Sequence, residues 1–276
     1  MPRLPALLLL LFVAACTPVG TVQVDRDLSR SIDSGALSGD ALADAYVDRG
    51  TLRLLNDDID AAIGDYDAAV AAAPDHVAAY VWRGQARDAK GEDKHAIEDF
   101  DHALALDPQA WQAYGARGLM RARGGEADGA LSDLGRAIEL GKNHEKEFLI
   151  QHTSNTPIQV MKPKGPPESG TARAEFTLRA DHYLSYVRAV RGGLLLERAR
   201  YDEALIDLDE AARLNPQSPR ARWNLGLAEL AIGRCAEGVQ ELRTASALTL
   251  GSPPAYMSTE RNRAFVAKTA CSDVVK

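Results

Sequence analysis

The strongest constraint on the fold is a pattern of small and large residues that recurs every 34 residues. The clearest copy spans residues 77–108 and predicts two short amphipathic helices, 77–90 and one ending near residue 106. Gly91 marks the turn between them, and Pro108 ends the second, because proline cannot continue a helix. A lone helix pair of this size cannot bury its apolar face, so it requires neighbouring copies.

The chain supplies those copies on both sides. The landmarks of the central copy are Tyr80, Gly84, Ala96, Phe100, Ala103 and Pro108. The preceding copy has Tyr46, Gly50, Ala62, Tyr66, Ala69 and Pro74, and the following copy has Tyr114, Gly118, Ala130, Leu134 and Ala137. Two weaker copies contain Gly192, Ala204, Leu208, Ala211 and Pro216, and then Gly226, Gly238, Leu242 and Ala245. Small residues are expected where the two helices touch.

A 34-residue period with this pattern resembles the tetratricopeptide repeat, a helix–turn–helix unit. Trp223-Asn224-Leu225-Gly226 is similar to the sequence that opens many repeats of the family. The resemblance implies an all-α helix-turn-helix solenoid of about five repeats with a C-terminal capping helix. In the family, the first helices line a concave groove that binds the partner. The matching positions here are Val47, Thr51, Val81, Trp82, Gln85, Asp88, Leu119, Tyr186, Trp223 and Leu227.

Breaks in the pattern predict the domain organisation. We expect a lipoprotein signal peptide (1–15), a flexible tether (16–40), repeats 1–3 (41–141), an insert loop (142–172), repeats 4–5 (173–250) and a capping helix with a tail (251–276). The insert is rich in proline and glycine. A structureless loop this long inside a compact array is uncommon and is often functional. A surface loop without a role and a decayed repeat are the alternatives.

The N-terminal residues predict secretion and a lipid anchor. An apolar run after Arg3 is too short to span a bilayer but fits a secretory leader. Val13-Ala14-Ala15-Cys16 resembles the bacterial lipobox, which implies that Cys16 carries lipid. Thr17 follows instead of an aspartate, which by the same resemblance favours the periplasmic face of the outer membrane. The alternative is an ordinary signal peptide with an incidental cysteine.

With Cys16 assigned to lipid, Cys235 and Cys271 remain. An even pair in an oxidising compartment indicates a disulfide bond. Two buried or free thiols are the alternative.

A charged pattern accompanies the landmarks. An arginine stands directly before four of the glycines, and an aspartate follows each arginine by 16 residues. These pairs are Arg49 with Asp65, Arg83 with Asp99, Arg117 with Asp133, and Arg191 with Asp207. We interpret them as structural ion pairs between the two helices of a repeat. The alternative is an arginine ladder for an anionic ligand.

The remaining chemistry predicts neither an enzyme nor a cofactor or metal site. His144-Glu145 begins like a zinc-protease motif, but Phe148 stands where the second histidine would fall. No nucleophile–base pair or metal-ligand spacing is visible. The net charge of −7 argues against nucleic acid, since phosphate binding needs a basic surface.

We therefore expect a non-catalytic, lipid-anchored scaffold that mediates protein–protein interactions in the bacterial cell envelope, as an adaptor or assembly factor. Its expected partner is an envelope protein, and self-association is compatible with the pattern. Trp82 and Trp223 are the expected contact anchors, because aromatic side chains dominate binding energies. The alternative for both is that they fill gaps between repeats. The alternative function is an envelope small-ligand binder or enzyme with the 142–172 insert as a lid.

Overall fold

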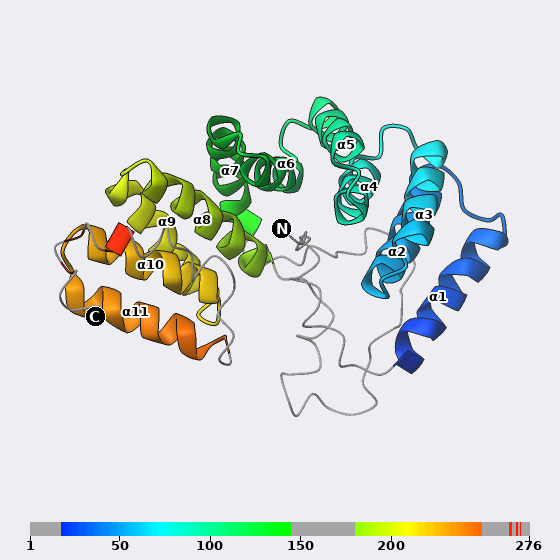
Figure 1. The fold of residues 1–276 in the computed structure, drawn as a ribbon. Coiled ribbons are helices and arrows are strands. Elements are labelled where there is room, and N and C mark those ends of the chain that lie inside the picture. Colours follow the sequence, from blue (N-terminus) through cyan, green and yellow to red (C-terminus); the bar gives the residue numbers. More distant parts are fainter. Residues whose placement is uncertain (1–17, 145–179, 250–264, 267–268, 270, 272–276) are drawn as a thin grey trace. The chain divides into compact units, whose positions relative to one another are not determined.

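The computed structural model describes residues 18–144 and 180–249, together with Phe265, Val266, Thr269 and Cys271. Within these residues, all regular elements are helices, which confirms the predicted all-α repeat fold (Figure 1). The helices are α1 (Pro18–Asp33), α2 (Gly39–Leu55), α3 (Ile59–Ala72), α4 (Val77–Lys90), α5 (Asp93–Leu106), α6 (Trp111–Gly124), α7 (Ala127–Gly141), α8 (Ala180–Glu197), α9 (Tyr201–Leu214), α10 (Pro219–Ala231) and α11 (Cys235–Ala247), with a short 3-10 helix at Lys142–His144.

The chain forms two compact units that divide between Met120 and Arg121, and each is described by itself. From α2 onward, two helices follow in sequence for each predicted copy. Within one unit, α2 packs against α3, α4 against α5, α8 against α9, and α10 against α11. A residue with positive φ follows the first helix of each pair within two positions of the helix end. Glycine fills this position after α4, α6 and α10, whereas Asp57 and Ala199 fill it after α2 and α8.

The landmark glycines mark the points of closest approach between paired helices. A methyl group added to Gly50 would lie 2.7 Å from the Tyr66 ring, and one on Gly84 would lie 2.7 Å from the Phe100 ring. On Gly192 it would lie 2.6 Å from Leu208. Real side chains do not approach so closely, so glycine is required for the helices to pack at this distance.

In the last pair, α10 and α11, both helices have a glycine at the contact. A methyl group on Gly226 would lie 2.8 Å from the carbonyl oxygen of Gly238, and one on Gly238 would lie 2.8 Å from that of Gly226. The backbones of α10 and α11 therefore meet directly. This explains why glycine replaces the usual alanine at position 238.

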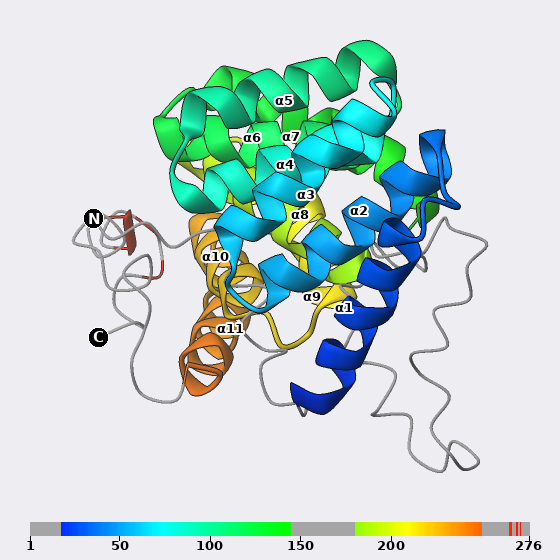
Figure 2. The ribbon, with the colours of Figure 1, turned by 90° about the vertical axis from the view of Figure 1, so that its right-hand side faces the viewer.

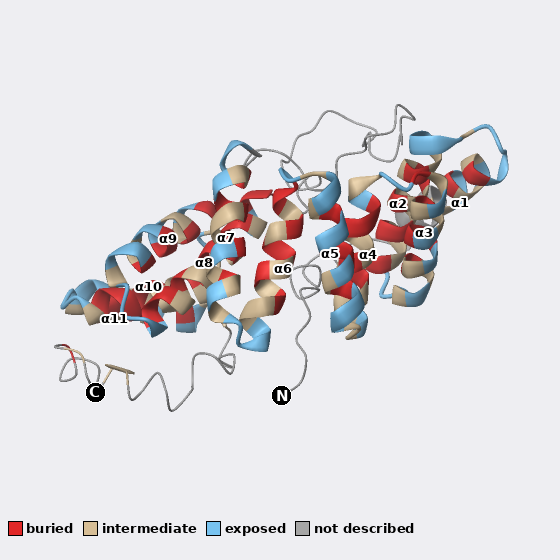
Figure 3. Ribbon diagram, turned by 90° about the horizontal axis from the view of Figure 1, so that it is seen from above, coloured by how far each residue is buried: buried red, intermediate tan, exposed pale blue. Residues whose placement is uncertain are grey.

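The large partners of the glycines form the centre of the core. Tyr66, Phe100 and Leu208 are fully buried, and the small landmarks Ala62, Ala96 and Ala204 are buried beside them. Figure 3 shows the buried residues along the facing sides of neighbouring helices. In the second unit, Phe265 and Val266 pack against the cluster that contains Leu208 and Leu225. They are the described part of the predicted capping helix, and they lie where that helix was expected to cover the last repeats.

The predicted tether is wrong for residues 18–33, because these residues form α1 beside α2 (Figure 2). Leu28 and Ile32, four residues apart on one face of α1, are buried. The Nη1 of Arg49 donates to Ser29 Oγ at 3.0 Å. The polar composition of this segment concealed an amphipathic helix that covers the first repeat. The predicted signal peptide, Cys16 and nearly all of the 142–172 insert lie outside the described residues.

We expect Gly84→Ala to lower the free energy of unfolding by about 1–3 kcal/mol, because the added methyl group overpacks the contact with Phe100. The matched control is Gly64→Ala in α3, where nothing lies within 4 Å of the added methyl group. There the same change should stabilise the helix by about 0.5–1 kcal/mol. Urea unfolding of both variants checks the prediction, and effects of the same sign would contradict it.

Candidate functional site

The structure places the predicted contact residues of the first helices in two different environments. Val47, Thr51, Val81 and Leu227 are buried. Val47, Val81 and Leu227 belong to the core clusters, and the Thr51 hydroxyl donates to the Val47 carbonyl at 2.8 Å. The structure corrects the prediction for these four residues, because neighbouring helices cover the positions that the family pattern assigns to the groove.

The other predicted contact residues are half-buried: Trp82, Gln85, Asp88, Leu119, Tyr186 and Trp223. In the first unit, Trp82 packs against the cluster around Tyr66. In the second unit, Trp223 packs against the cluster around Leu208, so both tryptophans contribute to packing. The exposed remainder of each side chain is the part that a partner could contact.

Tyr186, Arg220 and Trp223 form what we call the aromatic face of the second unit. The Arg220 guanidinium lies over the Tyr186 ring, 5.6 Å from its centroid. Arg220 and Trp223 are three residues apart in α10 and therefore share a side of that helix. The indole Nε1 of Trp223 is buried and has no hydrogen-bond acceptor among the described residues. An unmet N–H of this kind costs about 1–3 kcal/mol.

The predicted ion pairs are present within the repeats whose two helices belong to one unit. Arg49 Nη2 lies 2.6 Å from Asp65, Arg83 Nη2 lies 2.6 Å from Asp99, and Arg191 Nη2 lies 2.7 Å from Asp207. All three carboxylates are buried. Arg117 and Asp133 belong to different units, so their pairing stays a prediction.

Asp65, Asp99 and Asp133 each also accept a second arginine at an equivalent position, which sequence reasoning missed. Arg53 Nη1 lies 2.9 Å from Asp65, Arg87 Nη1 lies 2.8 Å from Asp99, and Arg121 Nη1 lies 2.6 Å from Asp133. These arginines stand three residues after the landmark glycine and recur with the same 34-residue period. That recurrence was the available signal.

The arginines also connect successive repeats. Arg83 Nη1 donates to Asp67 on the preceding α3 at 2.8 Å, and Arg117 Nη1 donates to Asp101 on α5 at 2.5 Å. The Arg83 guanidinium additionally lies over the ring of Tyr80. The guanidinium groups of Arg49, Arg83, Arg117 and Arg191 all bind carboxylates of the protein itself. The alternative interpretation, an arginine ladder for an anionic ligand, therefore loses its support.

The fifth repeat lacks the two arginines of this network but keeps an acid at the aspartate position. Leu225 and Glu229 stand at its two arginine positions, and Glu241 stands at the aspartate position. Glu229 is only 8% exposed, and its Oε2 has no hydrogen-bond partner among the described residues. Burial, together with Glu241, Asp209 and Glu237, raises the pKa of Glu229 to about 7, against the opposing effect of Arg234.

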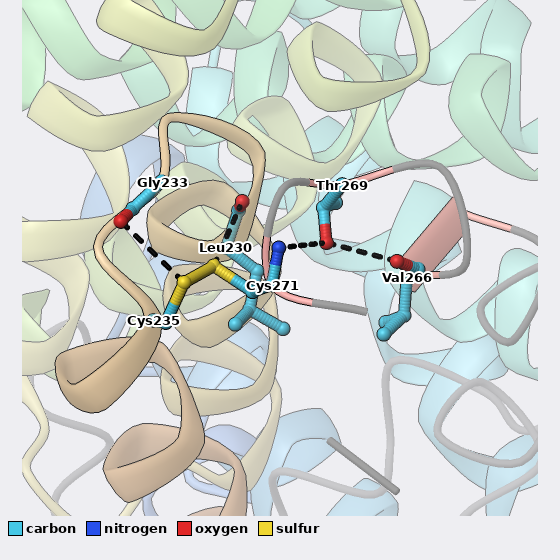
Figure 4. The surroundings of a disulfide bond; sticks show 6 residues. All are labelled: Leu230, Gly233, Cys235, Val266, Thr269 and Cys271. Carbon is cyan, nitrogen blue, oxygen red and sulfur yellow. Dashed lines mark hydrogen bonds between the residues drawn. A yellow bond between two sulfur atoms is a disulfide. The ribbon is translucent and has the colours of Figure 1, made fainter. Parts of the chain in front are cut away.

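Cys235 and Cys271 are joined by a disulfide bond, as the sequence indicated (Figure 4). Cys235 begins α11, and Cys271 is fully buried. Just before it in the chain, the Thr269 hydroxyl donates to the Val266 carbonyl at 2.8 Å. The bond therefore ties the segment that carries Phe265 and Val266 to the start of α11.

The residues that the structure describes contain no group of His, Cys, Asp and Glu side chains able to hold a metal ion. Among the described helices, none combines the length and the apolar character needed to cross a bilayer.

Comparison with known proteins decides the family. A model described as tetratricopeptide repeat matches residues 41–110, 94–145 and 190–249, more than half of the chain. The chain belongs to the tetratricopeptide repeat family. Proteins of this family typically serve as scaffolds for protein–protein interaction. No curated protein matches this tetratricopeptide repeat protein in sequence.

The chain is similar to solved structures of other proteins. One is YrrB, titled a tetratricopeptide repeat protein with an unusual peptide-binding site. It is 17% identical, the match covers 81% of this chain and 92% of YrrB, and the TM-score is 0.51. Another is MamA, which is 21% identical over 73% of this chain and 94% of MamA, with a TM-score of 0.46. At these identities the likeness concerns the fold alone.

We expect Asp99→Ala to lower the free energy of unfolding by about 3–5 kcal/mol, because it leaves Arg83 and Arg87 without their buried acceptor. The matched control is Asp67→Ala, which removes the other carboxylate bound to Arg83. The Asp67 side chain is 52% exposed and that of Asp99 only 4%, so the control should cost about 0–1 kcal/mol. Urea unfolding measures both variants. Equal losses of unfolding free energy would show that burial does not determine how much each carboxylate stabilises the protein.

Glu229 predicts a pH-dependent stability. Folding raises the pKa of Glu229 from 4.5 to about 7. The contribution of Glu229 to the free energy of unfolding is therefore complete below about pH 4.5 and is lost as the pH rises to about 7. Glu229→Gln should therefore stabilise the protein at pH 8, by up to about 3 kcal/mol, and change little at pH 4. The control Glu203→Gln alters an exposed carboxyl whose pKa is lowered by its hydrogen bond to Arg200.

Hydrogen exchange of the α10 and α11 amides at pH 4 and pH 8 tests this prediction. Slower exchange in Glu229→Gln at pH 8 alone is the expected result. The same change at both pH values would show that Glu229 is not a protonated, buried acid.

Proposed function

We propose that this tetratricopeptide repeat protein is a non-catalytic, lipid-anchored scaffold of the bacterial cell envelope, an adaptor or assembly factor that binds a partner protein through its first helices. The observation that carries the proposal is the aromatic face: a half-buried tryptophan with an unmet indole N–H beside a tyrosine–arginine pair. Tryptophan, tyrosine and arginine are the residues most enriched at the energetic centres of protein interfaces.

The unmet N–H of Trp223 indicates the chemistry of the partner. A backbone carbonyl is the most abundant hydrogen-bond acceptor in any polypeptide. Because Nε1 is buried in the free protein, the indole has to shift on binding before a bound carbonyl can accept from it. That hydrogen bond would then remove the cost of leaving the donor unpaired. The face therefore suits a peptide segment better than a small apolar ligand, which would offer no acceptor.

The anchor and the location are proposed from the sequence of residues 1–16, where Cys16 follows the lipobox-like Val13-Ala14-Ala15. The periplasmic face of the outer membrane remains the proposed site. The Cys235–Cys271 bond fits that proposal, because oxidising compartments preserve disulfides.

Trp223→Phe tests the binding role without emptying the core position, because phenylalanine retains apolar bulk and lacks the N–H. If the indole donates to a partner, crosslinking of the envelope partner in intact cells should fall about fivefold, the equivalent of about 1 kcal/mol, while the melting temperature stays within a degree or two. Trp82→Phe is the matched control in the first unit. Unchanged crosslinking in Trp223→Phe would reduce Trp223 to a packing residue.

Cys16→Ser should abolish metabolic labelling of the protein with a fatty-acid probe and release it from membranes, because serine cannot form the thioether. Cys271→Ser, which removes a different cysteine, should keep the lipid label. Continued labelling of Cys16→Ser would contradict the proposed anchor.

A further inference from the structure

The last repeat differs from the others at the positions that carry the ion-pair network. In the second repeat, two guanidinium groups lie among the carboxylates of Asp67 and Asp99. At the equivalent positions of the fifth repeat, Asp209 replaces Asp67, Glu241 replaces Asp99, and Leu225 and Glu229 replace the two arginines. The fifth repeat therefore has carboxylates at both acid positions but no arginine at the two positions between them.

We call Asp209, Glu229 and Glu241 the acidic flank. They come from α9, α10 and α11, and α10 packs against both other helices. The charged groups that act on Glu229 are Asp209 from α9, Glu237 and Glu241 from α11, and Arg234 from the turn before α11.

Within the described residues, Arg222 and Arg234 are the arginines seen to act on the flank. Arg222 Nη1 donates to Glu241 at 2.8 Å. Arg234 opposes the effect of the acids on Glu229 but forms no hydrogen bond with Glu229 Oε2, which is unpartnered within the described residues. In the part of the chain that the structure describes, these three carboxylates thus share two arginines, and the most buried of the three, Glu229, has an unmet acceptor.

We propose that the acidic flank binds the guanidinium group of an arginine side chain that a partner protein presents. The protein itself shows the occupant that such carboxylates accept, since Arg83 and Arg87 approach the equivalent acids at 2.6–2.8 Å. Asp209 is exposed and the Glu241 side chain is 21% exposed, so the flank is open to solvent at its edge while Glu229 lies deeper. A guanidinium group offers five N–H donors, enough to reach more than one of these acids.

The inference rests on the proposed role as a protein scaffold but concerns a different surface. In α10, Glu229 lies nine residues after Arg220 and six after Trp223, which places it about 180° around the helix from Arg220 and about 120° from Trp223. The two surfaces can therefore be tested separately.

The binding should depend on pH, because only the ionised form of Glu229 attracts a cation. With a pKa of about 7, the ionised fraction at pH 5 is about 1%. Affinity for an arginine side chain should accordingly be up to about a hundredfold lower at pH 5 than at pH 8. Burial is the main cause of this raised pKa, and the charges of Glu241, Asp209 and Glu237 raise it further while that of Arg234 lowers it.

The test uses the peptide acetyl-Gly-Arg-Gly-amide and, as its neutral match, the same peptide with citrulline in place of arginine. Binding to the full chain is followed at low salt by NMR of carboxyl-labelled glutamate, which reports on Glu229 directly. We expect the arginine peptide to shift the Glu229 signal at pH 8 and not at pH 5, and the citrulline peptide to shift it at neither pH.

Variants then distinguish binding at the acidic flank from nonspecific electrostatic attraction of the arginine peptide to an acidic protein. Glu229→Gln, which keeps the shape of the side chain, should weaken the arginine peptide at least tenfold when binding is followed on the peptide resonances. Glu203→Gln and Trp223→Phe should leave that binding unchanged. Equal binding of the two peptides, or full binding to Glu229→Gln, would overturn the proposal. If Trp223→Phe fails to affect the cellular partner, the scaffold face is wrong but the flank result still stands.

Discussion

The structure depends on the close approach of two helices at one glycine in the first, second, fourth and fifth repeats. A methyl group at Gly50, Gly84 or Gly192 would lie within 2.7 Å of the large residue on the facing helix. The network of charges is attached to the same contact, because each of these glycines follows an arginine and each large residue follows an aspartate. Helix packing therefore brings the guanidinium and the carboxylate together, and the ion pair is buried where the apolar contact is tightest.

A buried carboxylate requires compensation, and the repeats provide it in two directions. Asp99 accepts Arg83 and Arg87 from the first helix of its own repeat, while Arg83 also reaches Asp67 of the repeat before. The charges thus specify both the pairing within a repeat and the order of neighbours. In the fifth repeat Arg222 compensates Glu241, whereas Glu229 Oε2 has no partner among the described residues and burial raises the pKa of Glu229 to about 7. The same departure gives the terminal repeat a surface chemistry that the others lack.

Much of this arrangement follows from the sequence, because a 34-residue period identifies equivalent residues without a structure. The helix pairs, the glycine contacts and the first arginine of each network were predictable in this way. The second arginine, Arg87 and its equivalents, carried the same period but stood outside the landmark positions. The helix α1 was missed because its polar composition hid the spacing of Leu28 and Ile32. The contact face was predicted only in part, since Val47 and Leu227 are buried in core clusters that include residues of the adjacent repeats as well as their own.

The most direct test of the central claim is a double-mutant cycle between Gly84 and Phe100, measured by urea unfolding. If their contact sets the helix spacing, Gly84→Ala should be destabilising alone and neutral or stabilising in the Phe100→Ala background, where the added methyl group enters the vacated space. The account predicts a coupling energy of about 1–3 kcal/mol. Additive effects of the two substitutions would show that the glycine is not there to admit the ring, and would contradict the account.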